Sequence, residues 1–333
     1  NISGWAIEAR VYAEDPFRDF LPSAGRLTSL LLPEQNEHVR VDSGVYEGGE
    51  VSLYYDPLMA KIITHGETRD EAIEWMSSAL DGLYIKGVSH NTAFLSALMA
   101  HPRFIEGRLS TGFIAEEYPE GFRAEDIPHD SISLLVAVAA AMHRSYVERS
   151  YQTSGLTQGL ARAVRDEWVV LMGSDEYLVA IRREEDLFTL AFNGEAHSLQ
   201  TEWRFGNPLF RCVFDGEELC LQVQRDGLSY LISHRGARVG ARVMTPKGAE
   251  LSRRIVHKPP SVQSNLVCTP MPGLLLRISV EVGQEVEPWQ EVAIVEAMKM
   301  ENVIRADREG KVKALLAEPG QALAVDQALV EFE

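Results

Sequence analysis

The 333-residue sequence has few of the features that mark several classes of protein. Its three cysteines, Cys212, Cys220 and Cys268, form no C-x-x-C pair, which argues against a disulfide framework or a cysteine-based zinc site. Basic residues are in the minority, with 32 Lys and Arg against 49 Asp and Glu and a formal net charge of -17. Nucleic-acid backbones select for clustered basic residues. We therefore expect a reducing compartment and no nucleic-acid partner.

Long apolar runs are also missing. The most apolar stretch, residues 132–142, is about half the ~20 residues that a membrane-spanning helix requires, so no membrane association is expected. The histidines show no metal-ligand spacing, and no P-loop pattern occurs. No secretory signal or basic presequence opens the sequence, and residue 1 falls just before a predicted strand. We expect the native protein to begin earlier.

The first ~118 residues alternate strand-like and helix-like patterns, which predicts an α+β unit. Thr68 and Glu71 form a capping box ahead of apolar residues spaced three and four apart, so a helix is predicted from there to Gly82. Two more helices are predicted at residues 91–100 and 112–117, and strands at residues 6–12, 39–41 and 51–55.

The middle of the chain predicts a different architecture. Residues 119–130 are polar with two prolines and read as a linker, and the helix predicted after them is apolar on every side. Such a helix must be surrounded. Residues 167–244 are short β-rich runs separated by hairpin-type dipeptides such as Asn193-Gly194 and Asp215-Gly216. We predict an antiparallel β-barrel wrapped around the helix, followed by a mobile linker at residues 251–265.

The last segment contains a repeat. An interval of 37 residues separates Gly273 from Gly310, and the same interval separates Gly283 from Gly320. Each half reads as glycine, apolar strand, Gly-Gln turn and apolar strand, as if one small β unit had been duplicated. Two such units sharing a core predict a flattened β sandwich, with the hairpin at the junction of the halves projecting from one end.

The junction carries the sequence E-A-M-K-M, with Lys299 between Met298 and Met300. A lysine with an ordinary pKa of about 10.4 is protonated and unreactive in water, but it is a good attachment point for an enzyme that supplies its own base. The methionines can pack flexibly beneath an attached ring. The plain alternative is a surface lysine in a turn. The position of Lys299 at the junction of a duplicated unit favours a modified lysine.

These residues resemble a known family. E-A-M-K-M at residues 296–300, preceded by P-M-P-G at residues 270–273, is similar to the biotinyl domain of biotin-dependent carboxylases. The resemblance implies that Lys299 is biotinylated and that Met298 and Met300 flank the biotin. A lipoyl domain also carries its modified lysine on a β-hairpin, but usually in an acidic D-K-A setting.

The N-terminal segment resembles the same enzymes. F-L-P-S-A-G-R-L at residues 20–27, V-R-V-D-S-G at residues 39–44 and Y-Y-D-P-L-M-A-K at residues 54–61 are similar to the C-terminal lobe of biotin carboxylase, an ATP-grasp fold. The resemblance implies that Arg40 lies beside biotin and stabilises negative charge on the ureido oxygen. A salt bridge on the strand surface is the alternative. The family's phosphate loop, ATP lysines and catalytic glutamates are expected to precede residue 1, so these residues alone should not use ATP.

The middle segment narrows the resemblance to one kind of carboxylase. A single β domain between the carboxylase lobe and the biotinyl domain is similar to the α subunits of propionyl-CoA and 3-methylcrotonyl-CoA carboxylases, and S-T-G-F-I-A-E-E-Y-P-E-G-F at residues 110–122 looks more like the propionyl enzyme. The implied segments are a carboxylase lobe at 1–118, a linker at 119–130, a helix-plus-barrel docking domain at 131–250, a linker at 251–265 and a biotin carrier domain at 266–333.

The resemblance implies a carboxylation of propionyl-CoA to methylmalonyl-CoA that uses ATP, bicarbonate and Mg²⁺ or Mn²⁺ in the full subunit and passes through biotin on Lys299. The implied partners are a carboxyltransferase β subunit, which would hold propionyl-CoA, and a biotin protein ligase. The implied compartment is the bacterial cytoplasm or the mitochondrial matrix. Two alternatives stay open: the α subunit of a 3-methylcrotonyl-CoA or other acyl-CoA carboxylase, and a non-catalytic carrier and assembly module.

Overall fold

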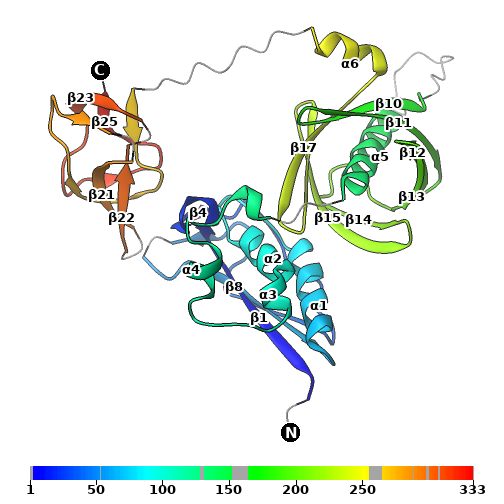
Figure 1. Ribbon diagram of the computed structural model, residues 1–333, viewed down its shortest axis with the longest axis horizontal. Helices are drawn as coiled ribbons and strands as arrows, with labels where there is room; N and C mark the ends of the chain where they lie inside the picture. The colour runs from blue at the N-terminus through cyan, green and yellow to red at the C-terminus, as the bar shows by residue number, and fades with distance from the viewer. Residues whose placement is uncertain are drawn as a thin grey trace.

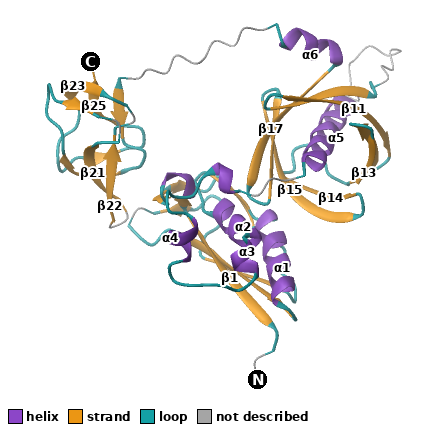
Figure 2. Cartoon of the chain, in the orientation of Figure 1, coloured by secondary structure: helices purple, strands orange, loops and turns teal. Residues whose placement is uncertain are grey.

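A computed structural model describes residues 3–52, 54–127, 131–151, 164–254, 265–287, 289–297, 300–306 and 308–332 (Figure 1). The elements fall into three groups, which we name the N-terminal lobe (β1 to η2), the barrel (α5 to β17) and the sandwich (β18 to β25). Helices occur in the lobe and the barrel, whereas the described part of the sandwich is built from strands and loops (Figure 2). The predicted combination of an α+β unit, an antiparallel β-barrel wrapped around a helix and a β sandwich is confirmed.

The lobe is built on a three-stranded antiparallel sheet in the order β1-β8-β6, with α1 packed on one face. Its strands are β1 (Trp5–Tyr12), β2 (Glu14–Asp15), β3 (Leu21–Pro22), β4 (Gly25–Arg26), β5 (Ser29–Leu31), β6 (Val39–Ser43), β7 (Glu50–Val51), β8 (Leu58–Gly66) and β9 (Tyr84–Lys86). Its helices are η1 (Pro16–Arg18), α1 (Arg69–Asp81), α2 (Thr92–Ala100), α3 (Pro102–Ile105), α4 (Phe113–Glu117) and η2 (Ala124–Asp126).

Of the elements predicted for the lobe, the helix with the capping box is confirmed and one strand is not. Thr68 caps α1 and forms the predicted capping box with Glu71. The Thr68 hydroxyl accepts a hydrogen bond from the Glu71 amide, and the Glu71 carboxylate accepts one from the Thr68 amide. The strand predicted at residues 51–55 is wrong, because β7 ends at Val51 and the tyrosines at 54 and 55 are exposed. The central strand is β8, in which the buried Ala60, Ile62 and Thr64 alternate with the more exposed Lys61, Ile63 and His65. Two of these positions, Ile63 and Thr64, do not match the expected polarity, so the sequence lacks a clear strand pattern.

The segment at residues 119–130 contributes to the core of the lobe. Phe122 and Ile127 are buried in an aromatic cluster with Phe94, Phe113 and Tyr118. Phe122 contacts Phe94 and Tyr118 in edge-to-face geometry, with ring centroids 5.2 and 5.6 Å apart. Much of this segment is therefore packed onto the lobe, although its composition is polar.

The barrel consists of eight antiparallel strands that close around one helix, as predicted. The strands are β10 (Glu167–Met172), β11 (Asp175–Glu184), β12 (Leu187–Phe192), β13 (Glu195–Gln200), β14 (Leu209–Phe214), β15 (Glu217–Asp226), β16 (Ser229–His234) and β17 (Ala237–Met244). Pairing of β10 with β17 closes the barrel. The dipeptides Asn193-Gly194 and Asp215-Gly216 form two-residue turns with positive φ at both positions, as two-residue hairpins favour.

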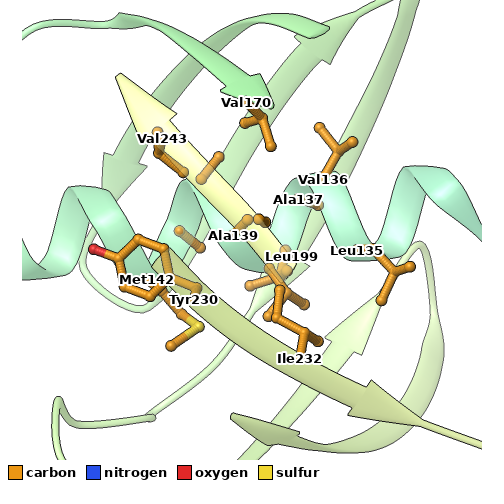
Figure 3. Packing of buried hydrophobic residues seen from close by; sticks show 14 of the residues in the cluster. Leu135, Val136, Ala137, Ala139, Met142, Val170, Leu199, Tyr230, Ile232 and Val243 are labelled. Carbon is orange, nitrogen blue, oxygen red and sulfur yellow. The ribbon is translucent and has the colours of Figure 1, made fainter. Parts of the chain in front are cut away.

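The enclosed helix is α5 (Ile132–Tyr151), and α6 (Pro246–Ser252) follows the last barrel strand. Nine consecutive residues, 134–142, are buried, so the helix presents apolar side chains in every direction. Figure 3 shows Leu135, Val136 and Met142 of α5 among barrel side chains such as Leu199 and Tyr230. The helix and the barrel thus share one core, because neither could bury its apolar surface without the other.

The buried end of α5 gives the barrel a predicted pH dependence. His143 Nδ1 lies 3.0 Å from the Tyr230 hydroxyl, and burial, helped by the charge of Arg225, lowers the pKa of His143 to about 4. Because the unfolded chain would protonate near pH 6.5, stability should fall as pH drops from about 6.5 to 4, by up to about 3 kcal/mol. We expect His143→Phe to lose this pH dependence, as measured by urea unfolding. At about pH 8, where both states are neutral, the variant reports only the lost hydrogen bond.

The sandwich consists of two four-stranded sheets, and its predicted two-fold repeat is confirmed. Its strands are β18 (Leu266–Cys268), β19 (Gly273–Ile278), β20 (Glu285–Val286), β21 (Glu291–Ala297), β22 (Met300–Arg305), β23 (Gly310–Leu315), β24 (Ala322–Leu323) and β25 (Ala328–Phe332). The sheet orders are β22-β21-β19-β24 and β18-β25-β23-β20. Each sheet therefore combines two strands from each half: β19 and β21 with β22 and β24, and β23 and β25 with β18 and β20.

The repeat extends to individual hydrogen bonds. The Gln290 side-chain oxygen accepts the amide of Glu287, and the Gln327 side-chain oxygen accepts the amide of Ala324, both at 2.9 Å. The residues before these glutamines, Trp289 and Asp326, both have left-handed φ values, 68° and 60°. The same turn thus occurs twice at the 37-residue interval.

Among the described helices of the chain, none is long and apolar enough to cross a membrane.

Candidate functional site

The junction of the two halves is an antiparallel hairpin of β21 and β22. The pairing runs from Glu291 with Arg305 to Ala297 with Met300. Met298 and Lys299 are the two residues that join these strands in the sequence, and they lie outside the described residues. Met300 opens β22 with 58% of its surface exposed, whereas Ala297 at the end of β21 is buried. The sequence therefore places Lys299 between a strand anchored in the core and a strand that begins at the surface.

The described part of the hairpin rests on β19. Leu274 pairs with Glu296 and Leu275 with Val295, and Val295 is fully buried. A Cβ atom on Gly273 would lie 2.5 Å from the Glu296 carbonyl oxygen and 2.6 Å from a methyl carbon of Val295, so only glycine permits this approach. This geometry suits a lysine that carries a covalent group such as biotin, because it fixes the strand that leads to Lys299.

The close approach of Gly273 predicts a substitution effect. Gly273→Ala should displace the end of β21 and slow biotinylation of Lys299 severalfold, measured by streptavidin shift during incubation with a biotin protein ligase. Gly310→Ala is the matched control, because Gly310 occupies the equivalent repeat position and its added Cβ would meet the Phe332 side chain instead. Equal biotinylation rates for the two variants would show that β19 does not set the hairpin geometry.

Arg40 lies in the lobe, on the sheet face opposite α1. Its side chain is 67% exposed, and its Nη2 atom lies 3.2 Å from Asp42 Oδ2. Across the sheet, Ile63 pairs with both Arg40 and Glu8, and Lys61 pairs with both Asp42 and Arg10. We name Glu8, Arg10, Arg40, Asp42 and Lys61 the charged face. It is an array of three cations and two carboxylates on three neighbouring strands.

The groups of the charged face interact electrostatically. Arg10 Nε donates to Glu8 Oε1 at 3.0 Å. This hydrogen bond lowers the pKa of Glu8, helped by the charges of Lys61, Arg10 and Arg40, and it also raises the pKa of Arg10. A separate carboxylate, Glu14 on β2, has a raised pKa because of burial and the nearby Asp56. With both carboxylates ionised, the three cations of the charged face leave it one positive charge in excess.

Sequence reasoning found Arg40 but missed its neighbours. The signal was present in β1, where Glu8 and Arg10 alternate with the buried Ala9 and Val11. Lys61 ends the motif at residues 54–61, but β8 was not predicted, so its place beside Arg10 and Asp42 was not predicted either. Arg40 lies in the lobe, and the β21–β22 hairpin lies in the sandwich.

Three family descriptions match the chain in succession. Residues 8–116 match the biotin carboxylase C-terminal domain, residues 135–258 match the propionyl-coenzyme A carboxylase BT domain, and residues 265–332 match the biotin-requiring enzyme domain. The chain belongs to the biotin-dependent carboxylase family. The lobe, the barrel and the sandwich correspond in order to these three matches, so the family assignment extends over nearly the whole chain.

Curated relatives match all or nearly all of the chain. The propionyl-CoA carboxylase alpha chain of Ruegeria pomeroyi is 43% identical over 353 residues, covering 100% of this chain and 52% of the relative. The mitochondrial alpha chain of Homo sapiens is 32% identical over 339 residues, covering 100% and 47%. The mitochondrial methylcrotonoyl-CoA carboxylase subunit alpha of Dictyostelium discoideum is 30% identical over 346 residues, covering 95% and 46%. The chain thus spans about half the length of the curated relatives it matches.

Proposed function

We propose that this carboxylase chain is part of a propionyl-CoA carboxylase α subunit, which carboxylates propionyl-CoA to methylmalonyl-CoA with ATP and bicarbonate. The match of the barrel to the propionyl-coenzyme A carboxylase BT domain is the observation that carries the proposal. The higher identity to the Ruegeria pomeroyi propionyl-CoA chain, 43% against 30% for the Dictyostelium discoideum methylcrotonoyl-CoA subunit, supports the same acyl-CoA. A 3-methylcrotonyl-CoA carboxylase is the second candidate.

Lys299 would hold the cofactor through an amide to its Nζ atom, with Met298 and Met300 on either side. Biotin bound there would supply a ring nitrogen that takes up a carboxyl group at one site and gives it up at another. The long lysine side chain would extend the reach of the biotin ring. The hairpin would give the ring a fixed attachment point, because β19 pairs with β21 and holds it in place. Attachment raises the effective concentration of the ring at both sites without any further contact.

Arg40 would stabilise the negative charge that develops on the ureido oxygen when the ring nitrogen loses its proton. A charge fixed in advance costs no reorganisation at the moment of reaction, which makes such groups effective. Asp42 and Glu8 would keep the guanidinium and its neighbour Arg10 oriented through their ion pairs. ATP, bicarbonate and Mg²⁺ or Mn²⁺ would act in the full subunit, on a site that the charged face helps to form.

We propose three domains that correspond to the predicted divisions 1–118, 131–250 and 266–333, with a linker at 251–265. The predicted linker at 119–130 is corrected, because Phe122 and Ile127 are buried in the core of the lobe and extend that domain. The barrel would dock a carboxyltransferase β subunit that binds propionyl-CoA, and a biotin protein ligase would modify Lys299. The sandwich would move between the two active sites on the linker at 251–265, most of which lies outside the described residues. The relatives include a bacterial protein and mitochondrial proteins, which supports a bacterial cytoplasm or a mitochondrial matrix as the compartment.

Competition between acyl-CoA substrates tests the proposal. The α subunit assembled with its β subunit is given ATP, bicarbonate and an equal mixture of propionyl-CoA and 3-methylcrotonyl-CoA, and both products are quantified. We expect methylmalonyl-CoA to dominate. Dominance of the 3-methylcrotonyl product would favour the second candidate, and a biotinylated assembly with no product from any acyl-CoA would indicate a non-catalytic carrier.

A further inference from the structure

The tip of the β16–β17 hairpin differs from the other turns of the barrel. It is formed by Arg235 and Gly236, with φ values of 48° and 84°, and the β12–β13 turn is formed by Asn193 and Gly194, with 51° and 84°. The two turns have nearly the same φ angles. A Cβ on Gly194 would meet nothing within 4 Å, whereas a Cβ on Gly236 would lie 2.9 Å from the Ala93 carbonyl oxygen of the lobe. The β16–β17 tip is therefore in close contact with α2.

Polar groups reinforce this contact at the C-terminal end of α1. The Arg235 amide donates to Asp81 Oδ1 at 2.8 Å, and His234 Nε2 lies 3.6 Å from Asp81 Oδ2. The His234 side chain is 3% exposed and the Asp81 side chain is 11% exposed. Gln222 of β15 donates to the Leu83 carbonyl at 2.8 Å. Backbone and side-chain groups of the barrel thus satisfy acceptors at the end of α1.

The position of Asp81 is informative in itself. A carboxylate at the C-terminus of a helix faces the negative end of the helix dipole and is unfavourable there, and the last turn of α1 contains no basic residue. The contacts with the barrel offset this cost. Ala237, the first residue of β17, adds an apolar contact by packing against the aromatic cluster of the lobe. Asp81 is therefore better explained by the interface with the barrel than by the stability of α1.

We propose that the β16–β17 tip and the end of α1 form a fixed interface that makes the lobe and the barrel one rigid body. A cavity of about 830 Å³ lies between them, lined by residues that include Tyr84 and His90 of the lobe and Gln222 and Arg238 of the barrel. The cavity interrupts the interface, and the contacts of Asp81, Gly236, Gln222 and Ala237 join the two parts around it. The use of this rigid body rests on the proposed function: it fixes the distance between the charged face and the docked β subunit, so that only the sandwich has to move.

Calorimetry on the full chain tests the interface without requiring biotin, so a failure here is distinct from a failure of the proposed function. In the wild-type chain, the lobe and the barrel should unfold in one shared transition. Gly236→Ala should split that transition into two, because the new methyl group forces the tip away from Ala93. Gly194→Ala carries the same backbone strain with open space around it, and it should keep a single transition. One shared transition for both variants, or two transitions in the wild type, would overturn the proposal.

A second pair of variants tests the polar contacts. Asp81→Ala removes the acceptor of the Arg235 amide, and Asp81→Asn keeps an acceptor without the charge. Hydrogen exchange at the Arg235 amide should be fastest in Asp81→Ala and intermediate in Asp81→Asn, and Asp81→Ala should also split the shared transition. Unchanged exchange and a single transition in Asp81→Ala would contradict the proposed interface.

Discussion

Replacing Lys299 with arginine is expected to abolish biotin attachment and, with it, all acyl-CoA carboxylation by the assembled enzyme. Arginine keeps the positive charge and most of the length, but its guanidinium remains protonated at any accessible pH and cannot form the amide. The loss should therefore be complete rather than partial. Streptavidin blotting and the carboxylation rate with propionyl-CoA measure the two effects.

Lys313→Arg provides the control for this substitution. Lys313 is a surface lysine of the same domain, on β23, and it forms an ion pair with Glu331 that arginine can also make. Biotinylation and turnover should be unchanged in Lys313→Arg. If Lys299→Arg retained biotin, the attachment site would be another lysine, and the assignment from the repeat junction would be wrong.

Replacing Arg40 with alanine should reduce the rate of biotin carboxylation by about 10²–10³-fold, the usual effect of removing one preorganised group that stabilises a developing negative charge. The stability of the lobe should hardly change, because the exposed Arg40–Asp42 pair contributes at most about 1 kcal/mol. The measurement is ATP-dependent carboxylation by the complete α subunit, with thermal unfolding alongside. Arg40→Lys should recover part of the rate, since it restores the charge without the planar guanidinium.

Arg108→Ala is the matched control for Arg40. Arg108 is 62% exposed and forms an ion pair with Glu106 two residues away, the same arrangement as Arg40 with Asp42. It does not lie on the charged face. Arg108→Ala should keep the wild-type rate. A wild-type rate in Arg40→Ala would assign Arg40 to an ordinary surface ion pair.

The features that sequence predicted correctly are those set by local geometry. The capping box of Thr68 and Glu71, the positive-φ turns at Asn193-Gly194 and Asp215-Gly216, and the 37-residue repeat each follow from residues close together in the chain or from direct self-similarity. The enclosure of α5 was also predictable, because a helix that is apolar on all sides must be surrounded by other parts of the protein.

The features that sequence missed depend on residues far apart in the chain. Arg144 of α5 is buried and donates to Asp166 Oδ1 at 2.9 Å and to the Ile181 carbonyl at 2.6 Å, and both partners lie more than 20 residues away in the chain. Asp81 reads as an ordinary helix-terminal residue, and its partners follow more than 150 residues later. The charged face needed the register of β6, β8 and β1, which no local pattern of the sequence contains.

The most direct test of the account is peptide mass spectrometry of the chain purified from its native source, with the modification located by fragmentation. We predict that the peptide containing Lys299 carries one biotinyl group on the lysine Nζ atom. A lipoyl group on Lys299, or an unmodified Lys299 in an otherwise active enzyme, would contradict the assignment of the β21–β22 hairpin as the biotin carrier.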